Sequence, residues 1–123
     1  MTETEKKAYM LLKSIIFHYH GLDEDEIQNL NETADELDAH EELEWASEFI
    51  SEDHMTSFDR AREYLSGVVG DMPKDKRTKY IHLVWKANLI KGYITEMEAT
   101  AMLQLAHDWN VHEELLKLVR SEN

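Results

Sequence analysis

Cysteine is absent from this chain of 123 residues, proline occurs once, and glycine occurs four times. Without cysteine, the protein has no disulfide bonds and no thiolate chemistry. The scarcity of proline and glycine leaves long segments uninterrupted, and apolar residues recur three and four positions apart rather than alternating. This spacing is typical of amphipathic helices and not of strands. We therefore predict an all-α fold.

Long apolar runs are also absent, since no segment approaches the roughly 18 apolar residues of a membrane-spanning helix. The first seven residues are polar and lack the apolar core of a secretory signal. A hydrophobic content of 42% nevertheless suffices for one packed core in a chain of this length. We expect a soluble, cytoplasmic protein without membrane insertion, folded as a single domain over residues 1–123.

Lysine and arginine are missing between Ser14 and Asp59, a segment that contains fifteen Asp and Glu residues. The formal net charge of −13 is therefore concentrated in the first half, because residues 60–123 carry ten basic and nine acidic residues. Nucleic-acid binding requires clustered Lys and Arg to replace phosphate counterions, so we expect none here. The acidic half instead favours a basic protein partner or divalent cations.

An internal repeat relates residues 22–43 to residues 94–115 at an offset of 72. Seven positions are identical, including the run His-Glu-Glu-Leu, and a glycine, Gly21 or Gly92, precedes each copy. Fixed-period self-similarity constrains the fold more than any single motif. We predict a compact bundle with internal pseudo-twofold duplication, whose repeat halves cover approximately residues 8–53 and 77–119.

The helical periodicity predicts about seven helices joined by short loops. They cover residues 3–19, 24–37, 39–50, 58–69, 73–90, 96–109 and 111–119. The segment 73–90 is apolar around most of its circumference, which predicts a buried central helix.

Four of the predicted helix starts place a capping residue three positions before a glutamate. The pairs are Asp23–Glu26, Asp38–Glu41, Thr95–Glu98 and Asn110–Glu113. In such a pair the cap oxygen accepts a hydrogen bond from the third helical amide, and the glutamate reaches back to the amide of the cap. Each cap contributes about 1 kcal/mol. Capping therefore explains the repeated glutamates without any ligand.

Residues 91–98 resemble the repeated turn of the tellurite-resistance TerB-like family. In that family the turn has the pattern Ala-Asp-Gly-x-Ile-x-x-x-Glu and occurs twice in a compact all-helical domain. The matching residues are Gly21, Leu22 and Glu26 in the first copy and Gly92, Ile94 and Glu98 in the second. The Ala-Asp of the family is replaced by Tyr19-His20 and Ile90-Lys91. The resemblance implies a divergent TerB-like domain over nearly the whole chain, with a role in tellurite resistance or stress response.

Asp23, Glu26, His20 and Glu98 are the candidate metal ligands. Carboxylates suit Ca²⁺ or Mg²⁺, whereas imidazole suits Zn²⁺ or Ni²⁺. Their spacing matches neither an EF-hand loop nor the His-Glu-x-x-His of zinc proteases. We interpret these residues first as helix caps and surface residues, and a divalent-metal site as the alternative. No other cofactor is predicted.

No nucleophile with a base, phosphate-binding loop or pair of catalytic carboxylates stands out, so we expect no enzymatic activity. The preferred hypothesis is a helical protein-interaction module, whose acidic face on residues 24–37 and 39–50 binds a basic partner. Trp45, if exposed, would anchor that contact, although core packing is the default for all three tryptophans. The alternatives are a divalent-cation-binding domain and an acidic inhibitor or DNA mimic.

Overall fold

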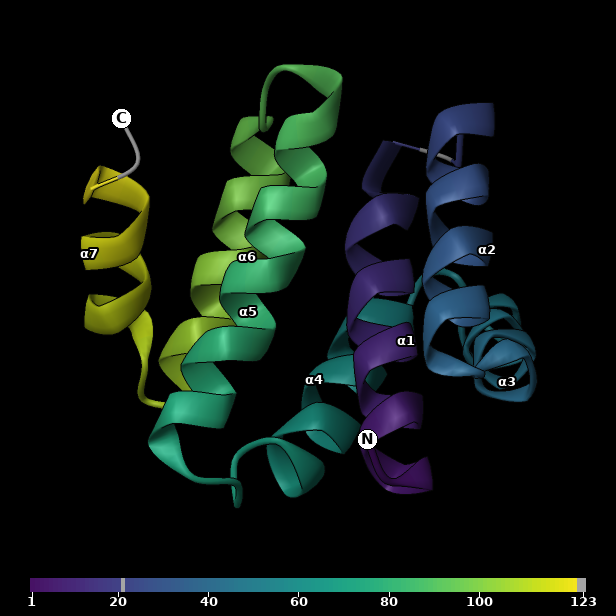
Figure 1. The fold of residues 1–123 in the computed structure, drawn as a ribbon, viewed down its shortest axis with the longest axis horizontal. Coiled ribbons are helices and arrows are strands. Elements are labelled where there is room, and N and C mark those ends of the chain that lie inside the picture. Colours follow the sequence, from purple (N-terminus) through teal and green to yellow (C-terminus); the bar gives the residue numbers. More distant parts are fainter. Residues whose placement is uncertain (21, 122–123) are drawn as a thin grey trace. The chain divides into compact units, whose positions relative to one another are not determined.

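The chain is helical throughout in the computed structural model, which describes residues 1–20 and 22–121 without the side chains of His20 and Lys91 (Figure 1). Within those residues there are seven α-helices, two short 3₁₀ helices and no strand. The elements are α1 (Glu3–Phe17), η1 (His18–His20), α2 (Glu24–Leu37), α3 (His40–Ser51), α4 (Ser57–Val68), α5 (Lys74–Asn88), η2 (Leu89–Lys91), α6 (Glu96–Asp108) and α7 (His112–Ser121). The all-α class and the seven helices are thereby confirmed. Among the described residues, no helix combines the length and the apolar character needed to cross a membrane.

Two of the four predicted caps are present. The Asp23 carboxylate accepts from the amide of Glu26 at 2.8 Å at the start of α2. At the start of α6, the Thr95 hydroxyl accepts from the amide of Glu98 at 3.2 Å, and the carboxylate of Glu98 accepts from the amide of Thr95 at 3.0 Å. Thr2 forms a further capping box at the start of α1. Its Thr-x-x-Glu pattern is visible in the sequence, so this cap could have been predicted.

The prediction that Asp38 and Asn110 cap the following helices is wrong. Both residues have a left-handed backbone, with φ of 53° and 56°. The next amide, of Ala39 or Val111, donates to a carbonyl five residues earlier at 2.8 Å in both copies. Asp and Asn tolerate this conformation better than other residues with a side chain, and it closes the end of the preceding helix. These residues therefore end α2 and α6 rather than start α3 and α7.

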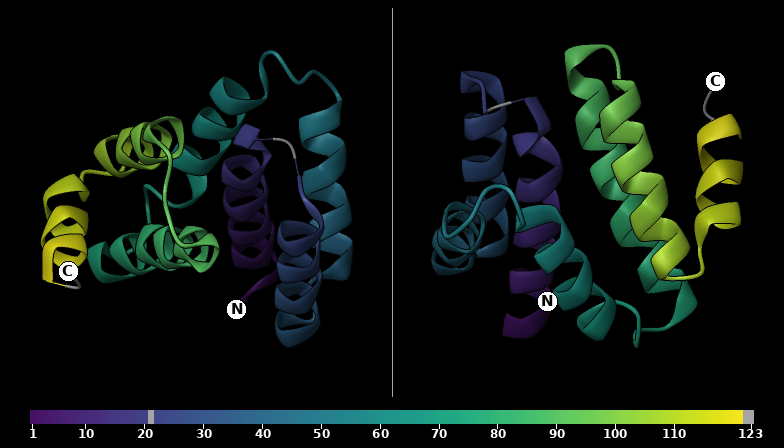
Figure 2. Two further views of the ribbon diagram at one scale, coloured as in Figure 1. Left: turned by 90° about the horizontal axis from the view of Figure 1, so that it is seen from above. Right: turned by 180° about the vertical axis from the view of Figure 1, so that it is seen from behind.

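The chain divides into two compact units, Met1–Val68 (unit 1) and Val69–Asn123 (unit 2). In unit 1, α1 packs against α2, α3 and α4, and Figure 2 shows α1 alongside these helices. Ten consecutive residues of α1, Ala8 to Phe17, are buried. An amphipathic helix buries one face, so the burial of α1 is more extensive than the apolar spacing of residues 3–19 predicts.

In unit 2, α5 packs against α6 and α7, and these two helices also contact each other. Buried side chains come from all three helices and from Trp109, which is 1% exposed between α6 and α7. The helix α5 ends at Asn88, so Leu89 and Ile90 belong to η2 and are 43% and 72% exposed. That the segment 73–90 forms a buried central helix of the whole chain stays a prediction.

The two units repeat several local features at the offset of 72 residues. A helix of 15 residues is followed by a 3₁₀ turn, a capped helix and a left-handed break, first over α1 to α3 and then over α5 to α7. Gly92 has a positive φ of 95° at the end of η2, whereas its counterpart Gly21 lies outside the described residues. The pseudo-twofold duplication and the single domain stay predictions.

Candidate functional site

The predicted metal ligands are engaged in helix caps where the structure describes them. Asp23 is exposed and bonded to the amide of Glu26 in the same turn. Glu98, in unit 2, is fully buried and accepts from the amide and the hydroxyl of Thr95, both at 3.0 Å. The side chain of His20 lies outside the described part of the chain. Among the side chains that are described, no group of three or more His, Asp or Glu could hold a metal ion.

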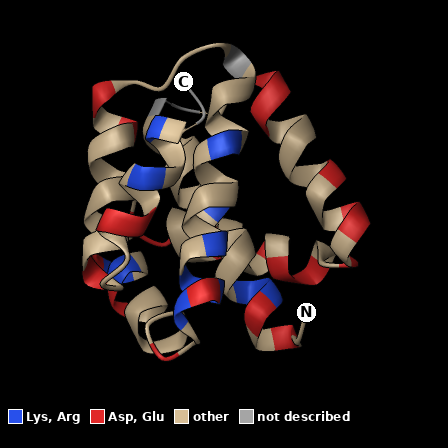
Figure 3. Cartoon of the chain, turned by 60° about the vertical axis from the view of Figure 1, so that its left-hand side comes forward, with Lys and Arg blue, Asp and Glu red and all other residues tan. Residues whose placement is uncertain are grey.

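The acidic surface belongs to unit 1. This unit contains eighteen acidic and five basic residues, whereas unit 2 contains eight of each. Of the fifteen acidic residues between positions 14 and 59, thirteen are exposed, the exceptions being Glu26 and Glu42. Figure 3 shows Asp and Glu distributed along α2 and α3, which contain no Lys or Arg. The formal net charge of the chain thus resides on unit 1.

Two lysines of α1 reach the same region, and the hydrogen bonds of their ammonium groups go to oxygens that carry no charge. The Nζ atom of Lys6 donates to the carbonyl oxygen of Asp38 at 3.1 Å, and that of Lys13 donates to the hydroxyl of Thr33 at 2.7 Å. Burial lowers the pKa of Lys13, while Glu36 and Glu32 oppose that change. Both ammonium groups are hydrogen-bonded to uncharged oxygens, so the surface keeps a strong negative field.

Four glutamates form an acidic stripe on α3, which we define as Glu41, Glu44, Glu48 and Glu52. Their spacing of three and four residues places them on one side of the helix. All four are exposed, and Glu52 is the C-cap residue with helical backbone angles. The opposite side of α3 carries the buried Ala46 and Ile50. The stripe therefore faces solvent along the whole length of α3.

An aromatic cluster borders the stripe and consists of Trp45, Phe49 and Tyr64. Trp45 lies four residues after Glu41 and three before Glu48, so these side chains are neighbours on the helix surface. The ring centroids are 5.5 Å apart for Trp45–Phe49, 5.2 Å for Trp45–Tyr64 and 6.1 Å for Phe49–Tyr64. All three residues are half-buried, and burial raises the pKa of Tyr64. The cluster links α3 to α4 and leaves part of its aromatic surface in contact with solvent.

Two cations of unit 1 already lie over rings of this cluster. The Nζ atom of Lys7 is 5.5 Å from the centroid of the Trp45 ring, and Cζ of Arg60 is 4.9 Å from that of Phe49. Both distances fall within the roughly 6 Å range of cation–π attraction. The rings of Trp45 and Phe49 therefore already take part in cation–π contacts with side chains of the same unit.

The aromatic cluster was only partly predictable. The apolar spacing of α3 includes Phe49, but core packing is the default prediction for Trp45, with an exposed anchor as the alternative, and no prediction covers Tyr64. The spacing Trp45-x-x-x-Phe49 between glutamates is the pattern that could have indicated it, since residues four apart share a helix face. Trp109 conforms to the core expectation, being 1% exposed, while Trp85 is half-buried.

In comparisons with known proteins, no protein-family model, curated protein or solved structure matches the chain.

Proposed function

We propose that the protein is a non-enzymatic helical interaction module, and that the surface of α3 binds a basic polypeptide partner. The observation that carries this proposal is that the exposed acidic stripe and the half-buried aromatic cluster lie next to each other on α3. Aromatic side chains that are partly exposed beside a charged rim are typical anchors of protein interfaces. The stripe supplies the charge complementarity, and the cluster supplies apolar and cation–π contacts for Lys or Arg.

The two parts of the surface contribute differently to binding. Each exposed ion pair with a stripe glutamate contributes at most about 1 kcal/mol and is weakened by salt. An Arg or Lys stacked on an exposed ring contributes about 0.5–1 kcal/mol, and more when the contact is desolvated. We therefore expect the acidic stripe to accelerate association, and the aromatic cluster to favour Arg over Lys because the planar guanidinium stacks on rings.

A pair of peptides tests this proposal. Fluorescein-labelled nona-arginine and nona-lysine carry the same charge but differ in their ability to stack. In anisotropy titrations at low salt, the wild-type protein is expected to bind nona-arginine more tightly than nona-lysine. Trp45→Ala should remove this preference while retaining the weaker, charge-driven binding. Equal affinities of the wild type for the two peptides, or an unchanged preference in Trp45→Ala, would contradict the proposal.

We also propose that the chain is a divergent TerB-like domain with pseudo-twofold duplication around α5, acting in tellurite resistance or stress response. The support is local: the left-handed breaks at Asp38 and Asn110 and the capped starts at Asp23 and Thr95 recur at one offset. Expression of the chain in a tellurite-sensitive bacterial host tests the functional part. Increased growth in tellurite is the expected outcome, and unchanged growth at confirmed expression would count against it.

A further inference from the structure

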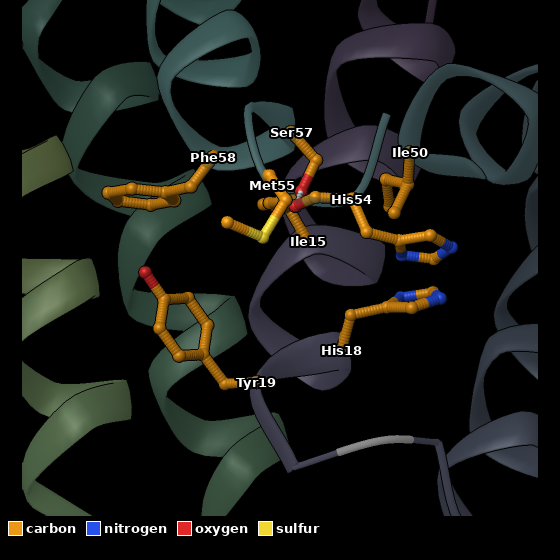
Figure 4. A pocket seen from close by; sticks show the side chains of 8 residues that line it. All are labelled: Ile15, His18, Tyr19, Ile50, His54, Met55, Ser57 and Phe58. Carbon is orange, nitrogen blue, oxygen red and sulfur yellow. Dashed lines mark hydrogen bonds between the residues drawn. The ribbon is translucent and has the colours of Figure 1, made fainter. Parts of the chain in front are cut away.

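A second candidate site lies in unit 1, where a hollow of about 330 Å³ opens between α1, η1 and the segment that joins α3 to α4. Figure 4 shows the side chains that line it, with the imidazoles of His18 and His54 next to each other at one side. The centroids of the two rings are 6.5 Å apart. No carboxylate is among the lining residues, which otherwise are apolar or carry hydroxyl groups.

The tautomer of His18 is set by its own helix. Its Nδ1 atom lies 2.7 Å from the carbonyl oxygen of Ser14, at the point where α1 ends. A carbonyl oxygen can only accept, so Nδ1 donates and Nε2 of the neutral ring keeps its lone pair. Histidines that bind metals commonly donate their other ring N–H to a backbone carbonyl in this way. His18 is therefore oriented as a metal ligand with Nε2 available.

The backbone that carries His54 is held by several hydrogen bonds. The hydroxyl of Ser57 donates to the carbonyl oxygen of His54 at 2.9 Å. One residue earlier, the carbonyl of Asp53 accepts from Arg60 at 2.8 Å, and its carboxylate accepts from the amide of Met55 at 3.1 Å. The main chain is thus anchored on both sides of His54, while its side chain is exposed and contacts the ring of His18.

We propose that His18 and His54 together bind one late first-row divalent ion, namely Cu²⁺, Ni²⁺ or Zn²⁺. Imidazole is a preferred ligand of these ions, and the absence of carboxylates from the lining argues against Ca²⁺ and Mg²⁺. With metal–nitrogen bonds of about 2.0–2.1 Å, two imidazoles on a tetrahedral ion have centroids about 5 Å apart. Rotation of the exposed His54 side chain would bring the two ring centroids from 6.5 Å to this separation. Water molecules would complete the coordination shell.

This site differs from the metal site that the sequence suggests. It uses neither Asp23 nor Glu26, and it pairs two histidines that are 36 positions apart in the chain. Sequence spacing does not indicate such a pair, because only the packing of α1 against α3 and α4 brings the two segments together. The proposal is also independent of the basic partner, since it involves no residue of the acidic stripe or the aromatic cluster.

A second histidine pair provides a matched control. His107 and His112 in unit 2 have ring centroids 5.8 Å apart, closer than those of the first pair. Among the described residues, no hydrogen bond fixes the tautomer of either ring, and neither ring lines the hollow of Figure 4. If proximity of imidazoles alone were sufficient, this pair would bind as well as His18 and His54.

Isothermal titration of the full, tag-free chain with CuCl₂, NiCl₂, ZnCl₂ and MgCl₂ tests the proposal. The wild type is expected to bind one Cu²⁺, Ni²⁺ or Zn²⁺ per chain, most tightly Cu²⁺, and no Mg²⁺. His54→Ala should weaken this binding about tenfold or more, because even the loss of a residue that only supports a ligand costs 10–100-fold. His107→Ala/His112→Ala should retain it.

Thermal unfolding with and without ZnCl₂ provides a second measurement, since an ion that binds only the native state raises Tm. His54 is exposed, so His54→Ala is expected to fold even if His18→Ala is destabilised by loss of its bond to Ser14. Loss of the Zn²⁺-dependent Tm increase in His54→Ala, with retention in the double variant of unit 2, supports the site. Unchanged metal binding in His54→Ala, no binding by the wild type, or loss only in His107→Ala/His112→Ala would overturn it.

Discussion

The guanidinium group of Arg60 lies 4.9 Å from the ring centroid of Phe49 and donates to the carbonyl oxygen of the same residue at 2.9 Å. Two further bonds join this guanidinium to the hydroxyl of Thr56 at 2.9 Å and to the carbonyl of Asp53 at 2.8 Å. One side chain of α4 therefore holds the end of α3, the connecting segment and one ring of the aromatic cluster. The same residue supports both the proposed binding surface and the backbone around His54.

Replacement of Arg60 by alanine should lower the free energy of unfolding by about 1.5–3 kcal/mol, the range for hydrogen bonds that involve a charged group. Arg60→Lys should recover less than half of this loss, because an ammonium group cannot reproduce the planar set of donors. Urea unfolding followed by circular dichroism measures both values. If Arg60→Lys were as stable as the wild type, the positive charge at this position, and not the three hydrogen bonds of the guanidinium group, would account for the stabilisation.

Alkaline pH should destabilise the fold through Tyr9. Burial, with a smaller effect of Glu36, raises the pKa of Tyr9 from 10.0 to about 12. The unfolded state then loses the phenolic proton first, so the stability that the neutral phenol contributes is present below pH 10 and is lost as pH rises towards 12. The full loss is about 2–3 kcal/mol. Urea unfolding between pH 8 and 11.5 should show a clearly smaller decline in Tyr9→Phe than in the wild type.

Lys13 should have the opposite effect on stability. Burial lowers its pKa from 10.5, so its charged form is penalised in the folded state, and this penalty is relieved as pH rises through the lowered pKa towards 10.5. Lys13→Met should therefore be neutral or stabilising at pH 7, since the hydroxyl of Thr33 still donates to the carbonyl of Asn29 at 2.9 Å. Lys13→Ala should be destabilising by about 1–3 kcal/mol, because it leaves a cavity. A lower Tm for Lys13→Met than for Lys13→Ala would contradict this account.

Substitutions at Thr95 and Asp38 distinguish a helix cap from a helix break. Thr95→Ala should cost about 1–3 kcal/mol, because it removes the cap oxygen and deprives the buried carboxylate of Glu98 of one donor. Asp38→Gly should change stability by less than about 1 kcal/mol, since glycine adopts the positive φ without strain. Chemical denaturation of both variants decides the matter. If Asp38→Gly lowered the free energy of unfolding as much as Thr95→Ala does, the result would indicate that Asp38 acts as an N-cap.

The helices were predictable because each depends on local spacing of apolar residues and on few glycines. The caps at Asp23 and Thr95 were equally local. The breaks at Asp38 and Asn110 were not, since Asp and Asn suit both an N-cap and a left-handed C-terminal residue, and the sequence pattern Asp-x-x-Glu does not decide between them. The choice is made by backbone hydrogen bonds that the sequence does not display.

The candidate sites were less predictable than the helices because they depend on packing between helices. The acidic half of the chain is evident from composition, but the contact between Trp45 of α3 and Tyr64 of α4 requires the two helices to be placed side by side. The pairing of His18 with His54 has the same origin. The two histidines come together through the packing of α1 against α3 and α4, and α1 is buried more extensively than its amphipathic pattern indicates.

Neutralisation of the acidic stripe is the most direct test of the central claim that α3 binds a basic partner. The test variant is Glu41→Gln/Glu44→Gln/Glu48→Gln/Glu52→Gln, and the control is Asp71→Asn/Asp75→Asn/Glu96→Gln/Glu113→Gln, which removes the same charge from exposed positions of unit 2. Four exposed ion pairs at about 0.2–1 kcal/mol each predict a dissociation constant for labelled nona-arginine at least about fourfold higher in the test variant at low salt. The control variant should stay within about twofold of the wild type. Equal weakening of both variants would show that only net charge is involved, and would contradict a binding surface on α3.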